Sequence, residues 1–400
     1  MALLDRLSSG DLSAVECVTA HLDQLHRVDG QTNAIASFED ERALADAREL
    51  DDEWARSGAV GPLHGLPITV KDWIDVEGFR CEGEEARHTD RRPEQDATVV
   101  ARLRRAGAVV VAKTRPWTQA GPRVNHPLDP ARSVGGSSSG EAVVVATGAS
   151  PLGIGSDSGG SIRLPAAWCG VFGLKPSAGL VPMTGHYPRL GGLSDGRSQI
   201  GPLAQDIDLL ERALAVMAGP DWRDAGAVPV PVRSSAGVEV AGMRFAVVDG
   251  GELVQPAVAS AVERAAAVLE AAGATQMPWI DGWLDDGLDI TQRYWRRTAR
   301  TGADAEAQLW DWDRYRRRYL TAAEHIELVL SPVAKETAPL DREIPGEDFL
   351  FTLPASLTGS PAVVVPAGRD DAGMPLSVQV IGRPWEDHCV LAAARLLGPA

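Results

Sequence analysis

Residues 133–161 read SVGGSSSGEAVVVATGASPLGIGSDSGGS and hold eight serines among many glycines. A Gly/Ser composition of this kind is typical of a flexible linker. Apolar residues that belong in a protein core interrupt it, however, at residues 143–146 and 152–154. Glycines in such a setting form tight backbone turns inside packed structure. The stretch therefore predicts an ordered loop system within the fold.

Two familiar glycine-rich sites fit this stretch poorly. A phosphate-binding loop needs a lysine directly after its last glycine, and no lysine follows either glycine cluster here. Residues 136–140 formally satisfy the GxSxG pattern of an esterase, with Ser138 as the nucleophile. That motif requires a strand before it, and the preceding residues are broken by prolines. An esterase of the α/β-hydrolase type using Ser138 therefore stays as the weaker alternative.

Two serines and a lysine offer a third chemistry. A serine hydroxyl is a poor nucleophile until a base removes its proton. A lysine can be that base once burial or cationic surroundings keep it neutral. Lys71 stands at the end of a predicted strand, and residues 158–161, SGGS, can direct backbone N–H groups at a developing oxyanion.

The rest of the chain alternates predicted helices with predicted strands. A capping box at Ser13–Glu16 begins a helix that its apolar residues continue to Leu25. Further helices are predicted over residues 39–52, 96–105, 206–217, 256–272 and 386–397. Strands are predicted over residues 66–70, 108–112, 243–248, 327–330, 363–365 and 376–381. This alternation predicts an α/β fold in which helices cover both faces of a mostly buried sheet. No low-complexity linker interrupts it, so one domain over residues 1–400 is expected.

Composition and charge exclude several classes of protein. Lys and Arg total 39 and Asp and Glu total 55, a net charge of −16, which disfavours binding to nucleic acid or to an anionic membrane. No run approaches the ~18 apolar residues of a membrane span, and the first residues lack a secretion signal. The four cysteines and eight histidines show no metal-binding spacing. We expect a cytoplasmic protein without a metal, and a homodimer is compatible with the sequence.

The sequence resembles the amidase signature family over nearly its whole length. The matching blocks are GPLHGLPITVKDWIDVEG (61–78), GGSSSG (135–140), GSDSGGSIRLPAAWCGVFGLKPS (155–177), GPLAQDIDLLERALAVMAG (201–219), LVLSPVAKETAP (328–339), FTLPASLTGSPAVVVPAG (351–368) and LSVQVIGRP (376–384). The resemblance implies a large mixed sheet and a Ser–cis-Ser–Lys triad.

In that triad, Lys71 is the base, Ser137 is the bridging serine that follows a cis peptide bond from Gly136, and Ser161 is the nucleophile. The backbone N–H groups of Ser158, Gly159, Gly160 and Ser161 would hold the oxyanion. Ser138, Asp157 and Arg163 match positions that support the loop through hydrogen bonds.

The implied activity is hydrolysis of a small linear amide through an acyl-enzyme, without a cofactor. Three alternatives share the same residues. The acyl group could pass to an amine other than water, as in an amide-forming tailoring enzyme. The chain could be the glutaminase-like subunit of a tRNA-dependent amidotransferase, which would need partner chains. A binding protein without catalysis is disfavoured because all three triad residues are intact.

Some stretches depart from the family pattern and bear on the substrate. Ser139 replaces a glycine, Arg115 replaces an asparagine, and the PWTQ element at residues 116–119 is a reduced form of a loop that walls the acyl pocket. The segment 278–319 holds five of the eleven tryptophans. It is interpreted as packing or as a substrate wall or lid. In the second case Arg115, Arg123 or the arginines at residues 314 and 316–318 would attract an anionic group.

Overall fold

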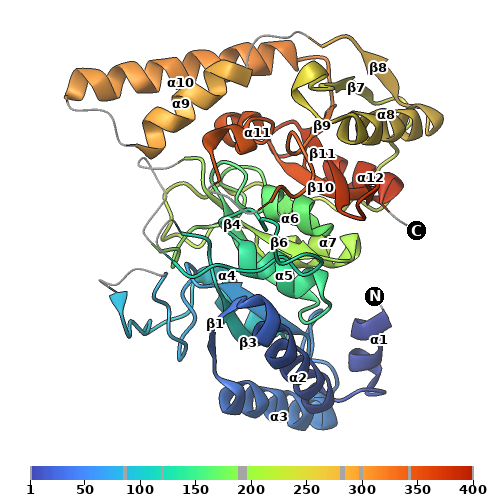
Figure 1. Ribbon diagram of the computed structural model, residues 1–400. Coiled ribbons are helices and arrows are strands. Elements are labelled where there is room, and N and C mark those ends of the chain that lie inside the picture. The colour runs from blue at the N-terminus through green and yellow to red at the C-terminus, as the bar shows by residue number, and fades with distance from the viewer. Residues whose placement is uncertain are drawn as a thin grey trace.

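An 11-stranded sheet forms the centre of the protein (Figure 1). The computed structural model describes residues 2–83, 88–118, 121–187, 196–279, 284–296, 301–340 and 344–398. The strands are β1 (Ile35–Phe38), β2 (Pro67–Lys71), β3 (Val109–Thr114), β4 (Leu152–Asp157), β5 (Phe172–Lys175), β6 (Gln199–Ala204), β7 (Arg244–Val247), β8 (Thr275–Met277), β9 (Leu328–Pro332), β10 (Ala362–Arg369) and β11 (Pro375–Gly382).

The strands lie in the order β1-β3-β2-β4-β6-β5-β10-β11-β9-β7-β8. β2 pairs in parallel with β3 and β4, and β7 pairs in parallel with β8 and β9. The other pairs are antiparallel, so the sheet is mixed, as the family resemblance implied.

Helices surround this sheet. They are α1 (Ala2–Ser9), α2 (Ala14–Thr32), α3 (Asp40–Ser57), α4 (Thr98–Arg105), α5 (Ser139–Ala146), α6 (Arg163–Cys169), α7 (Ile207–Met217), α8 (Pro256–Ala271), α9 (Leu284–Trp295), α10 (Gly302–Ala322), α11 (Leu353–Thr358) and α12 (Asp387–Leu397). Two 3₁₀ turns, η3 (Gly251–Leu253) and η4 (Gly346–Phe349), complete the described elements. No described helix is both long and apolar enough to cross a membrane.

The buried apolar residues form two clusters on opposite faces of the sheet. On β10, Val363 and Val365 belong to one cluster and Val364 to the other, and neighbouring strand residues point to opposite faces. The first cluster includes side chains of α4, α7, α8 and α12, and the second includes side chains of α2, α3 and α5. Helices on both faces of a buried sheet confirm the predicted fold class.

Most predicted elements are present with small shifts of their ends. The capping box of Ser13 and Glu16 forms, and α2 continues past the predicted end until Asn33 adopts a left-handed conformation. Short elements such as β1, β5 and α11, and the long helix α10, were not predicted. The Gly/Ser stretch is ordered, because it contains α5 and β4 with their apolar residues buried.

The topology brings several loops to one edge of the sheet. β2 and β4 run parallel as neighbours, with Ile68 opposite Leu152 and Val70 opposite Ile154. Their carboxyl ends therefore lie together, which places Lys71 beside the residues that follow β4. Ligand sites in open α/β sheets commonly lie at this edge.

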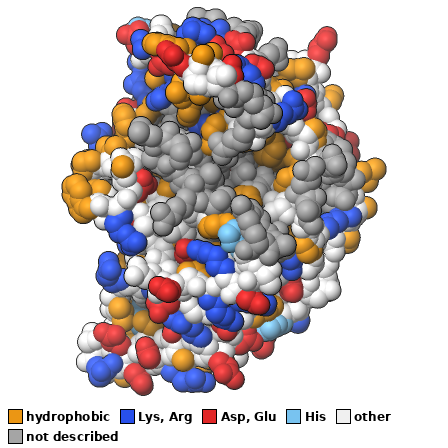
Figure 2. Space-filling model, turned by 90° about the vertical axis from the view of Figure 1, so that its left-hand side faces the viewer, with side chains coloured by type: hydrophobic (Ala, Val, Ile, Leu, Met, Phe, Trp, Pro, Cys, Tyr) orange, Lys and Arg blue, Asp and Glu red, His pale blue; other side chains and the backbone are white. Residues whose placement is uncertain are grey.

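The surface carries both signs of charge. On the face shown in Figure 2, Lys and Arg side chains are interspersed with Asp and Glu side chains, and the described residues form no large region of a single sign.

Four buried cysteines are free thiols.

The central strands should be sensitive to loss of packing. Leu174 on β5 is fully buried in the first cluster, so Leu174→Ala should lower the free energy of unfolding by about 2–5 kcal/mol. The matched control is Leu309→Ala on α10, where the leucine is 61% exposed and the change should be below about 0.5 kcal/mol. Urea unfolding followed by tryptophan fluorescence measures both; equal effects would contradict this description of the core.

Candidate active site

Lys71 lies at the end of β2 with its side chain fully buried. Thr69 and Lys71 are two residues apart and share one face of the strand, the face covered by α5. The Thr69 hydroxyl donates to Glu141 of α5, and the Lys71 amine contacts the loop that leads into α5. The strand thus aims the lysine into the Gly/Ser loop system.

The Lys71 amine is held by oxygen atoms of three serines. Nζ lies 2.7 Å from Ser137 Oγ, 3.1 Å from Ser138 Oγ and 3.1 Å from Ser156 Oγ. The face of the Trp73 ring covers it, with 4.3 Å between Nζ and the ring centroid. Among the described residues, no carboxylate forms an ion pair with this amine.

Burial sets the protonation of this lysine. Removal from water lowers the pKa of Lys71 to about 7, although the negative charges of Asp157 and Glu141 act in the opposite direction. A large share of the amine is therefore neutral near pH 7 and can accept a proton.

Ser137 and Ser138 have different environments. The Gly136–Ser137 peptide bond is cis, as the resemblance implied, and Ser137 keeps 8% of its surface exposed. Ser138 is fully buried; its Oγ lies 3.2 Å from the Ser156 carbonyl oxygen and accepts from the Ser156 N–H at 3.3 Å. An esterase nucleophile must be accessible, so this burial argues against Ser138 in that role and for support of the loop.

Ser161 lies on the loop between β4 and α6 and is partly exposed. Its carbonyl oxygen accepts a hydrogen bond of 3.0 Å from the Ser138 N–H, which fixes the two serine loops to each other. No hydrogen bond between described residues joins the side chains of Ser137 and Ser161. The side chains of Lys71 and Ser137 are therefore in direct contact. Ser161 is joined to them by the backbone hydrogen bond from Ser138.

All four carbonyl groups of residues 158–161 are hydrogen-bonded. Arg197 donates to the Ser158 carbonyl at 3.1 Å, and the Thr352 hydroxyl donates to that of Gly159. The Leu164 N–H donates to the Gly160 carbonyl, and the Ser138 N–H to that of Ser161. These hydrogen bonds fix the direction of all four carbonyl groups, and so they also fix the direction of the N–H groups of the same loop.

One of the four predicted oxyanion donors is already engaged. The Gly160 N–H donates to Asp157 Oδ1 at 2.7 Å, so in this structure it does not point to a substrate. Among described residues, the N–H groups of Ser158, Gly159 and Ser161 have no hydrogen-bond acceptor. The oxyanion prediction is therefore restricted to these three.

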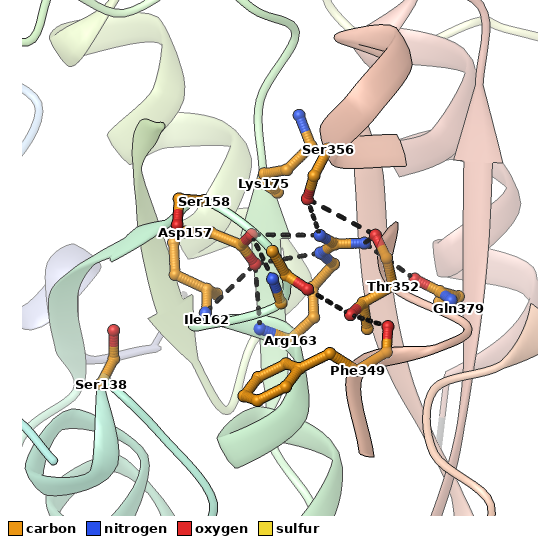
Figure 3. A network of polar contacts seen from close by, with 12 residues as sticks. Ser138, Asp157, Ser158, Ile162, Arg163, Lys175, Phe349, Thr352, Ser356 and Gln379 are labelled. Carbon is orange, nitrogen blue, oxygen red and sulfur yellow. Dashed lines mark hydrogen bonds and ion pairs between the residues drawn. The ribbon is translucent and has the colours of Figure 1, made fainter. Parts of the chain in front are cut away.

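Asp157 and Arg163 form a fully buried ion pair behind the loop (Figure 3). The carboxylate accepts from Arg163 through Nε and Nη2, both at 3.0 Å, and from the N–H groups of Gly160 and Ile162. Burial raises the pKa of Asp157, but the Arg163 charge and these hydrogen bonds outweigh it and leave the pKa below its usual value. Asp157 thus holds the N–H groups of Gly160 and Ile162 in place, and Arg163 in turn holds Asp157.

The far side of the guanidinium contacts the C-terminal part of the fold. Arg163 donates to the Thr352 carbonyl at 2.7 Å, to Ser356 Oγ at 2.7 Å and to Gln379 Oε1 at 3.3 Å. Figure 3 shows these partners on one side of Arg163 and Asp157 on the other. The ion pair therefore connects β4 and α6 with α11 and β11.

Sequence reasoning missed two residues of this site. Glu141 is fully buried on α5, where its carboxylate accepts from Thr69 at 2.6 Å and from Thr114 at 2.7 Å; burial raises its pKa to about 7. Arg197 is 1% exposed and lies against the ring of Tyr294 on α9, 4.6 Å from its centroid. A charged residue in either position more often faces solvent, so neither carried a signal in the sequence.

Some tryptophans of the segment 278–319 pack against neighbouring residues, whereas one lies beside the candidate site. Trp279 packs against Tyr319, and Trp312 donates its Nε1–H to the Leu357 carbonyl, both structural roles. Trp295 instead lies against Gly159 in the loop of residues 158–161, where a side chain on the glycine would begin 2.6 Å from the ring. Trp283 lies outside the described residues.

The predicted anion-attracting arginines have other partners. Arg115 donates to the backbone carbonyls of Asn33 and Ile35, and Arg123 to that of Pro130. The arginines at positions 314, 317 and 318 pair with aspartates of α9 and α10. Hydrogen bonds to the backbone for Arg115 and Arg123, and ion pairs for the other three arginines, favour structural roles over substrate binding. No group of three or more His, Cys, Asp or Glu side chains among the described residues is arranged to hold a metal ion.

A protein-family model named Amidase matches residues 16–281 and 288–391 of the chain. The chain is 31% identical to the A subunit of the glutamyl-tRNA(Gln) amidotransferase of Moorella thermoacetica, over 98% of this chain and 94% of that protein. It is also 31% identical to the AtzE subunit of the 1-carboxybiuret hydrolase of a Pseudomonas species, over 99% and 97% of the two chains.

Solved structures agree with these sequence matches. A chain from a vestigial protein complex related to an s-triazine catabolic enzyme superposes with a TM-score of 0.89 at 29% identity, over 99% of this chain and 97% of that one. Fatty acid amide hydrolase superposes with a TM-score of 0.89 at 22% identity, over 100% and 84%, which shows a common fold.

The buried ion pair should contribute far more to stability than a surface pair. Asp157→Asn leaves the Arg163 charge without a partner inside the protein, so the free energy of unfolding should fall by about 3–5 kcal/mol. Asp313→Asn removes the same kind of pair with Arg317, whose side chain is 75% exposed, and should cost about 1 kcal/mol or less. Denaturant unfolding of the three proteins tests this; a small effect at Asp157 would refute its role as the anchor of the loop.

Proposed function

The chain belongs to the amidase family, and from this membership together with the Lys71–Ser137 contact we propose that it hydrolyses the carbon–nitrogen bond of a linear carboxamide. Ser161 is the nucleophile and carries the acyl group, Ser137 transfers protons, and Lys71 is the base. The observation that carries this proposal is a fully buried amine, with a pKa of about 7, at 2.7 Å from a serine hydroxyl.

In the first step Lys71 takes the proton of Ser137 while Ser137 takes the proton of Ser161. Ser161 Oγ attacks the amide carbon, and the carbonyl oxygen becomes an anion that the N–H groups of Ser158, Gly159 and Ser161 can bind. The carbon–nitrogen bond then breaks as Ser137 donates a proton to the departing amine and regains one from Lys71. A water molecule repeats the sequence on the acyl-enzyme and releases the acid.

The contact still missing from this relay is the hydrogen bond between Ser137 and Ser161. Catalytic hydrogen bonds are often long without substrate and shorten in the complex. The Ser138 N–H bond to the Ser161 carbonyl supports this step, because it already holds the two loops in register.

A second candidate is the amide-cleaving component of an amidotransferase. The similarity to a glutamyl-tRNA(Gln) amidotransferase chain over 98% of the present one favours it. The same triad would then release ammonia for another reaction, and activity would depend on partner chains. Turnover by the purified single chain distinguishes hydrolysis from this alternative.

Labelling by a fluorophosphonate should identify Ser161 as the activated serine. We expect one adduct, located on Ser161 by peptide mass spectrometry and absent from Ser161→Ala. Lys71→Met should slow labelling at least ~100-fold, because the general base is lost. An adduct on Ser138 would instead revive the esterase alternative.

Lys175→Met is the matched control for Lys71→Met. Lys175 is equally buried, and burial likewise lowers its pKa to about 7, but its amine donates to the Pro176 carbonyl and, among the described residues, forms no hydrogen bond with Ser137, Ser138 or Ser161. This variant should label at nearly the rate of the unmodified chain. Equal loss in both variants would show that removing any buried amine disables the protein, which would refute a specific role for Lys71.

The rate should rise with pH across neutrality. The pKa of Lys71 is about 7, so the neutral amine that acts as base is scarce at about pH 5.5 and predominates above about pH 8. The rate of fluorophosphonate labelling should therefore increase through about pH 7 and then level off. Circular dichroism at each pH confirms that the protein stays folded. A rate that falls over this interval would exclude a neutral lysine as the base.

A further inference from the structure

Three tryptophans contact the loops that carry the proposed catalytic residues. The Trp73 ring lies over Lys71 Nζ. The Trp117 N–H donates to the Ser137 carbonyl at 2.9 Å, and a side chain on Gly136 would begin 2.6 Å from Trp117 Cβ and 3.0 Å from its Cγ. Trp295 Cζ2 lies 2.6 Å from the corresponding point on Gly159. Both glycines leave space that an indole occupies.

These tryptophans differ from a core tryptophan in the same place. Trp168 packs against Gly135 with only 2% of its surface exposed, and its Nε1–H donates to the Glu336 carbonyl. Trp117 and Trp295 are each 37% exposed, and Trp73 is half-buried. Large apolar surface left exposed beside reacting groups indicates a ligand-binding wall.

The rings of Trp73 and Trp295 are held in position without a ligand. The Trp73 Nε1–H donates to the Gly83 carbonyl at 3.1 Å. Trp295 meets the Phe349 ring edge to face, with 5.5 Å between centroids and 79° between planes. The Trp117 backbone N–H donates to the Ser137 carbonyl, and the Trp117 Cβ and Cγ atoms lie beside Gly136. A fixed aromatic surface binds a planar ring without an ordering cost, because few side-chain rotamers must be immobilised.

Trp117 and Trp295 lie in two stretches that depart from the family pattern. Trp117 belongs to the PWTQ element, and Trp295 to the segment 278–319. Each contacts a glycine near a proposed catalytic serine, Gly136 before Ser137 and Gly159 before Ser161. Two stretches far apart in the sequence thus supply the same kind of side chain to one site.

We propose that the substrate is an amide bearing an uncharged aromatic ring, which Trp117 and Trp295 bind next to the scissile bond. This inference rests on the proposed function, since it takes Ser161 as the reacting group. Aromatic rings attract one another edge to face or offset, and such a contact adds about two- to tenfold in binding beyond the buried area. A saturated ring of the same size lacks this aromatic contribution to binding.

The experiment compares two matched pairs of amides by kcat/KM. Phenylacetamide and cyclohexylacetamide carry the ring on the acyl side; N-benzylacetamide and N-(cyclohexylmethyl)acetamide carry it on the amine side. We expect the aromatic member of one pair to be preferred about tenfold. The pair that shows this preference tells whether the ring lies on the acyl side or on the amine side of the scissile bond. Equal rates within both pairs, or a preference for the saturated members, would overturn the proposal.

Variants separate recognition from support of the loops. Trp117→Leu and Trp295→Leu should each reduce the aromatic-to-saturated ratio several-fold. Trp310→Leu on α10, where the tryptophan is 53% exposed, is the control and should leave the ratio unchanged. A uniform loss of rate on both members of a pair, with the ratio intact, would mean that the two tryptophans only brace the loops, and it would overturn the inference.

A binding measurement keeps this test apart from that of the proposed function. If the folded chain cleaves none of the four amides, calorimetric titration of each amide into it decides the inference. Tighter binding of the aromatic members without turnover would support aromatic recognition and count against hydrolysis of these amides by the single chain. Absence of that preference would remove the aromatic proposal.

Discussion

The Asp157–Arg163 ion pair is the constraint on which the site depends. Two charges withdrawn from water are stable only when their geometry is good and their remaining hydrogen-bonding capacity is used. Asp157 meets this condition by accepting from the N–H groups of Gly160 and Ile162 as well as from Arg163. The backbone of residues 158–162 must therefore bend around the carboxylate. Its shape follows from satisfying a buried charge, and the glycines make that path sterically accessible.

The same ion pair influences the electrostatics of the neighbouring amine. Arg163 neutralises Asp157 at close range, so the carboxylate only partly offsets the cost of burying a charge on Lys71. Glu141 carries only part of a negative charge near neutral pH, because burial raises its own pKa to about 7. Desolvation consequently dominates at Lys71. Because the nearby charges largely cancel one another, burial is free to lower the pKa of Lys71 to about 7 even though charged residues surround it.

The sequence allowed the fold class and the proposed catalytic positions to be predicted, for different reasons. Apolar periodicity located α2, α7 and β10, because burial of one helical or strand face leaves a regular trace. Lys71, Ser137 and Ser161 came from motif resemblance, since three ordinary residues far apart carry no such trace. The engagement of the Gly160 N–H by Asp157 could not be foreseen, because it depends on the backbone path of the loop. Glu141 and Arg197 were missed because their burial depends on partners far away in the sequence.

Arg197 joins the loop of residues 158–161 to the helices of the tryptophan-rich segment. Its guanidinium donates to the Ser158 carbonyl and to Thr291 Oγ1, and it lies near the rings of Tyr294 on α9 and Trp312 on α10. Helices α9 and α10 pack together at one end of the molecule (Figure 1). Helices α9 and α10 therefore cannot be exchanged without also affecting the loop of residues 158–161. Replacing these helices by others, through natural recombination or by design, would also have to supply a new hydrogen-bond donor for the Ser158 carbonyl.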